Sequence, residues 1–188
     1  VGWEARAYFP LCVDLTDQNC GVVGGGNVAE RKVRQLIVFG AAVTVVSPKL
    51  TVGLTELEQA GQLIWEKRPA GTGEDPASAG IALVVAATDD QPVNRAVSEW
   101  CRSRRIPVNV VDEKELCTFF FPAVAKDGEV VVSASTGGTS PALAARLRRQ
   151  LLDGLLSEGG EAFGKTKEGR VSGERFAGYG HAAAVMGG

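Results

Sequence analysis

The chain has 188 residues, of which 45% are hydrophobic and 22% are charged, and its formal net charge is −2. This length indicates one domain, or one domain with a small appendage. A domain of this size can bury a hydrophobic core without help from disulfides or metals. The near-neutral charge gives no electrostatic reason to expect nucleic acid, and no apolar run reaches the ~18 residues that span a membrane. We therefore expect a globular, cytoplasmic protein with neither a nucleic-acid nor a membrane partner.

The cysteines and the single histidine are scattered along the chain, at Cys12, Cys20, Cys101, Cys117 and His181. Zinc needs convergent sulfur or nitrogen ligands, which are usually paired closely in sequence. We therefore predict no metal site and expect the cysteines to be small core residues with free thiols.

Strand and helix patterns alternate through the first two-thirds of the chain. Continuous apolar runs, which are typical of strands buried on both faces, occupy 19–23, 42–46, 82–87 and 107–111, with a further short strand expected at 64–66. Between them, apolar residues at helical spacing occupy 28–39, 54–60 and 92–104. This alternation predicts an α/β fold, a Rossmann-type doubly wound parallel sheet over residues 7–115.

Residues 116–157 have a different character and predict a small α+β dimerisation region. Residues 128–135 alternate like a half-exposed strand, and a helix is expected from Pro141, with Ser140 as its N-cap. An apolar stripe recurs along that helix at Leu143, Leu147, Leu151 and Leu155. Because this region is too small to hold its own core, we expect the stripe to pack against another surface, such as a second copy of the chain. Residues 158–188 are predicted to be a flexible tail.

A glycine-rich segment, GGGNVA at 24–29, fits the pattern G-x-G-x-x-A between the first strand and the first helix. Gly24 allows a tight turn, the missing Cβ of Gly26 lets a pyrophosphate approach, and Ala29 lets the helix pack closely on the strand. The N–H groups and dipole of the helix favour phosphate at this end. The segment predicts a dinucleotide site; the alternative is a glycine-rich turn that only joins strand to helix.

The acidic residue that usually binds the NAD ribose about 20 residues further on is absent. The second strand ends instead in Ser47, Pro48 and Lys49. Ser47 can hydrogen-bond a ribose hydroxyl and Lys49 can tolerate a 2′-phosphate, so the residues leave NAD and NADP both open. At the end of the next strand, Thr88 is expected to line the cofactor, whereas Asp89 either faces it or caps the following helix.

Asp112 follows the strand predicted at 107–111, which places a carboxylate at the same sheet edge. A carboxylate there can exchange a proton while hydride moves, if its pKa lies near the working pH. The alternative is a solvated aspartate in a turn, which the residues by themselves slightly favour.

Several stretches together resemble the family of siroheme synthase N-terminal domains, which are precorrin-2 dehydrogenases and in some members also sirohydrochlorin ferrochelatases. The resemblance covers about residues 7–156. The stretches are YFPL at 8–11, VVGGGNVAERK at 22–32, ATDD at 87–90, NVVD at 109–112, FPA at 121–123 and STGGTSP at 135–141.

The resemblance implies a homodimer that oxidises precorrin-2 to sirohydrochlorin with NAD⁺ as hydride acceptor. It implies that Asn27, Val28, Ser47 and Pro48 contact the cofactor and that Asp112 is the general acid/base. Fe²⁺ is inserted by bifunctional members; for this chain we expect the dehydrogenase and leave Fe²⁺ open as a further substrate. A second class of function is a non-catalytic NAD(H)-binding module that senses redox state.

The substrate is a polycarboxylate, so it needs cations and N–H donors. Arg146, Arg148 and Arg149 lie on the last helix. We predict that the turn before this helix exposes N–H groups and binds substrate carboxylates, through Thr136, Gly137, Gly138, Thr139 and Ser140. Thr136 falls where some members of the family carry Ser. The alternative is that the turn is an ordinary helix cap.

Overall fold

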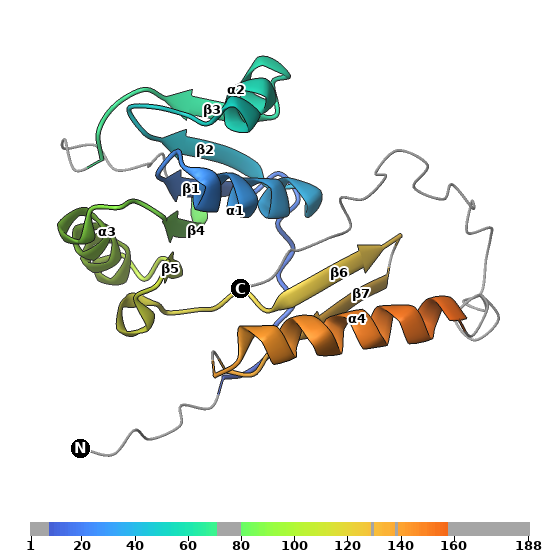
Figure 1. The fold of residues 1–188 in the computed structure, drawn as a ribbon. Coiled ribbons are helices and arrows are strands. Elements are labelled where there is room, and N and C mark those ends of the chain that lie inside the picture. The colour runs from blue at the N-terminus through green and yellow to red at the C-terminus, as the bar shows by residue number, and fades with distance from the viewer. Residues whose placement is uncertain (1–7, 71–79, 129, 138, 158–188) are drawn as a thin grey trace, which may run out of the picture. The chain divides into compact units, whose positions relative to one another are not determined.

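The structure is a computed structural model that describes residues 8–70, 80–128, 130–137 and 139–157. The described residues form two compact units, one within residues 10–120 and the other made by residues 8 and 9 together with the described residues between 121 and 157. Figure 1 shows the elements of both units. The predicted tail, 158–188, lies outside the described residues.

The first unit is a five-stranded parallel sheet with strand order β3-β2-β1-β4-β5. The predicted α/β fold with a doubly wound parallel sheet is therefore confirmed. In chain order its elements are β1 (Asn19–Val23), α1 (Asn27–Val38), β2 (Ala42–Val46), α2 (Val52–Gln59), β3 (Leu63–Glu66), β4 (Ile81–Ala86), α3 (Gln91–Ser103), β5 (Val108–Val110) and the 3₁₀ helix η1 (Lys114–Leu116).

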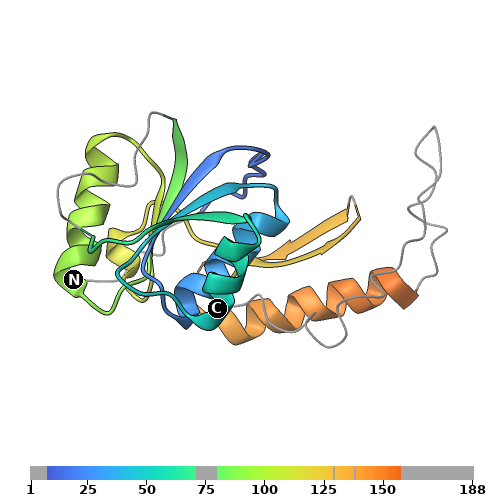
Figure 2. The same ribbon diagram turned by 90° about the horizontal axis from the view of Figure 1, so that it is seen from above.

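Helices cover both faces of this sheet, which is why its central strands are almost wholly apolar. Figure 2 shows α3 on one side and α1 with α2 on the other. On the α3 side, Val97 and Cys101 of the helix pack against Val84 and Val108 of the sheet in one buried cluster. On the other side, α1 turns its small and branched apolar residues inward, and these are fully buried: Ala29, Val33 and Leu36.

The carboxyl ends of the parallel strands meet at one edge of the sheet. Val23, the last residue of β1, is in register with Val46 of β2 on one side and with Ala86 of β4 on the other. Ala86 is in turn in register with Val110 of β5. The strand order reverses between β1 and β4, and ligands of open α/β sheets bind in the crevice at such a point.

β5 is shorter than the predicted strand because the chain turns immediately after Val110. Beyond that turn the chain runs back along the open side of β5, where Thr118 N–H donates to the Val108 carbonyl (2.8 Å) and Val108 N–H donates to Thr118 Oγ1 (2.8 Å). The edge of the sheet is therefore covered without a sixth strand.

The second unit is an antiparallel hairpin, β6 (Ala123–Asp127) and β7 (Val130–Ala134), followed by α4 (Pro141–Ser157). The helix packs on both strands and buries Ala144 and Arg148. The Arg148 guanidinium donates to the carbonyl of Val124 in β6 (3.4 Å). A hairpin and a helix thus share one small buried contact surface.

The leucine stripe of α4 is not the face that packs on this hairpin. Leu143, Leu147 and Leu151 are 45%, 39% and 51% exposed. The side chain of Leu155 lies outside the described part. The described leucines remain available to another surface.

Within the described ranges, no helix has both the length and the apolar character needed to cross a bilayer. In the same ranges, no three side chains of His, Cys, Asp or Glu gather into a group that could hold a metal ion. The cytoplasmic location and the expected absence of nucleic-acid, membrane and metal partners stay predictions.

Candidate dinucleotide-binding site

The glycine turn between β1 and α1 is packed tightly from two sides. Gly24 has φ +121°, and a Cβ there would collide with the carbonyl of Ala87 at the end of β4. A Cβ on Gly25 would collide with the carbonyl of Lys49, after β2. The sequence pattern did not single out Gly25, although three consecutive glycines were the available signal. Both glycines are required by the neighbouring backbone, before any ligand is considered.

Gly26 differs from the first two glycines because it faces open space. A Cβ on Gly26 would meet no atom within 4 Å. As the N-cap of α1 it offers no side chain to the helix, and the first intrahelical bond runs from Glu30 N–H to the Gly26 carbonyl (2.9 Å). The preceding N–H groups of α1, including those of Asn27 and Val28, therefore have no intrahelical acceptor.

The other α-helices of the described structure each have a side-chain cap. Thr51, Asp90 and Ser140 accept from N–H groups in the first turns of α2, α3 and α4, at 3.2, 3.1 and 3.2 Å. An uncapped helix N-terminus with open space in front of it fits a bound anion. The residues present therefore fit the pyrophosphate of a dinucleotide.

Glu30, in the first turn of α1, bonds to neighbouring side chains and not to the open space in front of Gly26. Its carboxylate accepts from Thr51 Oγ1 and from the Arg34 guanidinium (2.8 Å). The Thr51 hydrogen bond is the main reason that the pKa of Glu30 is lowered; burial opposes the shift, and Arg34 adds to it. These bonds connect α1 to the start of α2.

The end of β2 carries the predicted residues Ser47 and Pro48. Ser47 is buried, and its hydroxyl donates to the carbonyl of Lys49 (2.7 Å). Trp65 Nε1–H donates to the Ser47 carbonyl (2.9 Å). The Ser47 hydroxyl proton is thus used within the loop, whereas Pro48 is exposed at the edge of the cleft.

The β4–α3 connection is held by an asparagine that the sequence pattern did not reveal. Asn94, 4% exposed, accepts from Thr88 Oγ1 (2.7 Å) and donates through Nδ2 to the Thr88 carbonyl (3.0 Å). The cap of α3 is Asp90, whose carboxylate accepts from Val93 N–H (3.1 Å). The suggestion that Asp89 caps this helix is therefore wrong; Asp89 is exposed.

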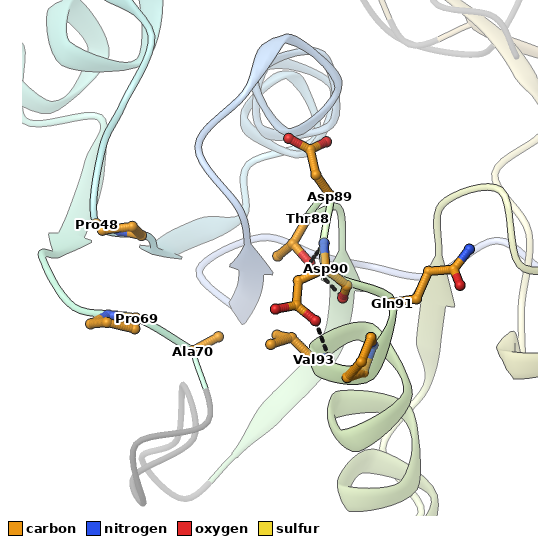
Figure 3. Close-up of a pocket in the computed structure, with 9 residues that line it drawn as sticks. Pro48, Pro69, Ala70, Thr88, Asp89, Asp90, Gln91 and Val93 are labelled. Carbon is orange, nitrogen blue, oxygen red and sulfur yellow. Dashed lines mark hydrogen bonds between the residues drawn. The ribbon is translucent and has the colours of Figure 1, made fainter.

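A cavity of about 700 Å³ opens at this edge of the sheet (Figure 3). One side is formed by Pro48, Pro69 and Ala70, after β2 and β3, and the other by the β4–α3 connection. Its lining on that second side comprises Thr88, Asp89, Asp90, Gln91, Pro92 and Val93. Two of the predicted cofactor residues, Pro48 and Thr88, therefore face each other across one mostly apolar cavity, as a flat ring would need.

Asp112 lies in the turn after β5, at the same carboxyl edge. It is exposed and has φ +61°, which is rare for a residue other than glycine. The turn is held by Cys117, whose thiol accepts from Val110 N–H (3.1 Å) and lies 3.2 Å from the Val110 carbonyl. Burial raises the pKa of Cys117, so it remains a thiol that can donate. Nothing in the sequence pattern indicated this role for Cys117.

In the turn before α4, the described N–H groups donate hydrogen bonds to oxygens of the same turn. Thr139 N–H donates to the Thr136 carbonyl (3.1 Å), Ser140 N–H to Thr136 Oγ1 (3.0 Å), and Gly137 N–H to Ser135 Oγ (3.2 Å). For the described residues, the prediction that this turn exposes its N–H groups is therefore wrong, because neighbouring oxygens accept from them. Gly138 lies outside the described residues. The part played by these residues in substrate binding stays a prediction.

The three arginines of α4 differ in their exposure to solvent. Arg146 and Arg149 are exposed, whereas Arg148 is 8% exposed and bonds to the hairpin. Of these three arginines, Arg146 and Arg149 can contact a substrate without rearrangement of this unit, whereas Arg148 cannot.

Known proteins match this chain over the same region. The family model described as "Putative NAD(P)-binding" matches residues 11–123. A siroheme synthase of Methylobacillus flagellatus is 46% identical over 143 residues, which cover 76% of this chain and 30% of the relative. A siroheme synthase of Nitrosospira multiformis is 45% identical over 148 residues, covering 77% of this chain and 31% of the relative. A solved structure named SirC, precorrin-2 dehydrogenase, aligns with TM-score 0.63 and 29% identity, covering 78% of this chain and 71% of that one.

The chain belongs to the family of siroheme synthase N-terminal domains. The family identified from sequence motifs is therefore confirmed. The chain spans about a third of the length of the siroheme synthases it matches. The residues that the family model matches, 11–123, include the glycine turn, the residues that line the cavity, and Asp112.

Proposed function

We propose that this domain catalyses the NAD⁺-dependent oxidation of precorrin-2 to sirohydrochlorin, a step of siroheme biosynthesis. The observation that carries the proposal is the uncapped N-terminus of α1, which opens beside Gly26 at the point where the strand order reverses. A family of NAD(P)-binding domains and a precorrin-2 dehydrogenase of similar fold support the same activity.

The reaction removes two hydrogen atoms, that is two protons and two electrons, from precorrin-2. A bound NAD⁺ would supply the hydride acceptor, and the second hydrogen would leave precorrin-2 as a proton, so that the products are sirohydrochlorin, NADH and H⁺. The chain's part is to hold the pyrophosphate with the first N–H groups of α1, whose dipole favours the negative charge. Pro48 and Thr88 flank the cavity and would contact the bound nucleotide.

Asp112 is the residue we propose to take the proton. Its carboxylate is exposed at the carboxyl edge of β5, in a turn fixed by the Cys117 thiol. A carboxylate held in this way can accept a proton from substrate as hydride leaves, which is general-base catalysis. The left-handed backbone at this position belongs to the turn that ends β5.

The decisive experiment incubates the protein with precorrin-2 and NAD⁺ and follows the absorbance of sirohydrochlorin. Asp112→Asn should reduce turnover by about 10²- to 10⁴-fold while NAD⁺ binding, measured by calorimetry, persists. Glu99→Gln, which removes an exposed carboxylate from α3, is the matched control and should leave turnover unchanged. Absence of oxidation by the unmodified protein, with NAD⁺ still bound, would favour the redox-sensing module. Adding Fe²⁺ after oxidation tests whether iron is a further substrate.

We also propose that the domain works as a homodimer in which a second copy covers the exposed stripe of α4. Leu143, Leu147 and Leu151 form a contiguous apolar row on a helix whose opposite face already packs on the hairpin. Leu147→Glu should shift the protein to monomer in sedimentation equilibrium, whereas Arg146→Glu, beside the stripe on the exposed surface, should not. An unmodified protein that is monomeric at assay concentration would contradict the proposal.

A further inference from the structure

We infer that Cys117 is a positioning residue for the oxidation, and that turnover depends on the bonds through which its thiol holds the turn that carries Asp112. The inference rests on the proposed function, since Cys117 would act through the proposed general base. It gives a part in the reaction to a buried thiol that contacts neither substrate nor cofactor.

Asp112 has a backbone conformation that its surroundings must hold. Its φ of +61° lies in the left-handed region, which residues other than glycine rarely adopt. Within the turn, Glu113 N–H donates to the Val110 carbonyl at 3.4 Å, which is longer than an ordinary N–H···O bond. A strained conformation persists only where neighbouring contacts over-determine it. The turn therefore depends on further bonds to keep Asp112 in one place.

The Cys117 sulfur supplies such bonds on both sides of Asp112. It accepts from Val110 N–H (3.1 Å), and it lies 3.2 Å from the Val110 carbonyl and 3.4 Å from the Glu113 carbonyl. A thiol has one proton, so it donates to one of these carbonyls at a time while it accepts from the N–H. Burial raises the pKa of Cys117, although the Val110 N–H bond opposes the shift, so the sulfur keeps its proton.

The segment that follows this turn is anchored to α3 by bonds that do not involve the thiol. Ser98 Oγ donates to the Leu116 carbonyl (2.7 Å). The Arg102 guanidinium donates to the Glu115 carbonyl (2.7 Å). Removal of the sulfur should therefore leave η1 in place and loosen mainly the turn that precedes it.

A loosened turn would act on the chemistry because a general base must lie within hydrogen-bond reach of the proton that it takes. The Asp112 side chain is exposed, so its position is set by its backbone rather than by packing around the carboxylate. A displacement of about 1 Å in a reacting group can cost about 10²-fold in rate. The bonds of the Cys117 sulfur are thus expected to appear in kcat.

Steady-state kinetics of the full chain with precorrin-2 and NAD⁺ test the inference. Cys117→Ala should lower kcat by about 10- to 100-fold, while the KM for precorrin-2 and the NAD⁺ affinity measured by calorimetry stay the same. Cys117→Val, which keeps the apolar volume but makes none of the bonds, should show the same loss. Cys117→Ser should restore most of the turnover, because a hydroxyl can donate and accept at the same place.

Cys101→Ala is the matched control. Cys101 is fully buried in the same apolar cluster as Cys117, but it lies near the carboxyl end of α3. The variant therefore removes the same sulfur atom away from the Asp112 turn. It should lower the free energy of unfolding in urea denaturation and leave kcat unchanged.

Combining Cys117→Ala with Asp112→Asn separates positioning from a general loss of structure. If the thiol acts through Asp112, its removal should change kcat by less than about twofold in the Asp112→Asn protein. A loss of about tenfold or more in that background, or an unchanged kcat for both Cys117→Ala and Cys117→Val, would overturn the inference and leave the proposed function in place. An unmodified protein that does not oxidise precorrin-2 would instead contradict the proposed function.

Discussion

Two glycine-containing turns lead into helices in this molecule, and they treat the helix N-terminus in opposite ways. The turn before α1 contains only glycines up to the cap, and Gly26 offers the helix no side-chain acceptor. In the turn before α4, the oxygens of Thr136 accept from the N–H groups of Thr139 and Ser140, and Ser140 Oγ accepts from Leu143 N–H. The first turn is open to an anion, whereas in the described part of the second turn the N–H groups of Gly137, Thr139 and Ser140 already have acceptors.

The difference shows that glycine content by itself does not identify a phosphate site. Glycine supplies positive φ values in both turns, at Gly24 and at Gly137. What separates them is whether hydroxyl or carboxylate oxygens stand near enough to satisfy the helix. Substitutions in the two turns test this contrast, and those at the packed glycines of the first turn should lower the free energy of unfolding most.

Replacing either packed glycine of the first turn should have the largest effect. Gly24→Ala and Gly25→Ala each place a Cβ against a backbone carbonyl, which cannot rotate away. Together with the strained φ at Gly24, we expect a loss of about 2–5 kcal/mol in the free energy of unfolding, measured by urea denaturation. Gly137→Ala is the control for the collision, because its Cβ would meet no atom closer than Tyr8 Cδ2 at 3.8 Å and its cost should be only that of the positive φ. Equal losses for all three variants would contradict the packing argument.

Gly26→Ala should separate binding from folding. A Cβ at this position meets no protein atom within 4 Å, so the free energy of unfolding should change by less than about 1 kcal/mol. The same methyl group would occupy the space in front of the α1 N–H groups and keep the pyrophosphate at a distance. We expect NAD⁺ affinity to fall about 10- to 100-fold, the order of a lost charge-assisted hydrogen bond. Unchanged affinity in calorimetry would show that the anion does not bind at this turn.

The two helices also bury one cation each, and pH should distinguish them. Lys32 of α1 and Arg148 of α4 are both 8% exposed. Burial, helped by the nearby Arg31 charge, lowers the pKa of Lys32 from 10.5 to about 8, although Cys117 opposes the shift. Between these values the unfolded chain binds more protons than the folded one, so this lysine's contribution makes the free energy of unfolding rise with pH.

Lys32→Met should therefore stabilise the fold most at pH 7, by about 2 kcal/mol, and the gain should shrink between pH 8 and 10.5. Burial also raises the pKa of Cys20 to about 11, which makes stability fall at high pH. That effect is common to both proteins and cancels in their difference. Arg148→Met is the control, because a guanidinium does not titrate in this range and its effect should be independent of pH. A Lys32→Met difference that is flat from pH 7 to 10 would contradict the buried-charge argument.

Much of this arrangement could be predicted from sequence because apolar periodicity is a local signal. The runs at 19–23 and 42–46 became β1 and β2 with the same bounds, and Ser140 was recognisable as a cap from its place before Pro141. Predictions that depend on contacts across the fold were weaker. Asp89 and Asp90 are adjacent and equally good caps, and only the path of the chain after β4 decides between them.

The positioning residues were beyond sequence reasoning for a similar reason. Asn94 lies one turn inside α3 yet bonds back to Thr88, and Cys117 bonds to a strand that precedes it by several residues. Neither residue type at that position carries a local pattern. Such contacts exist only once strand and helix are packed together.

The smallest expected effect concerns the second turn, and it decides between a cap and a substrate site. Ser140→Ala removes the oxygen that accepts from Leu143 N–H, so the free energy of unfolding should fall by about 1 kcal/mol. Because the described N–H groups of the turn already have internal acceptors, the KM for precorrin-2 should stay the same. Thr139→Val removes a hydroxyl that donates to the Thr136 carbonyl and should behave alike. If KM rose for both variants while urea denaturation showed no loss, the turn would bind carboxylates despite its internal bonds, and the contrast with the α1 turn would fail.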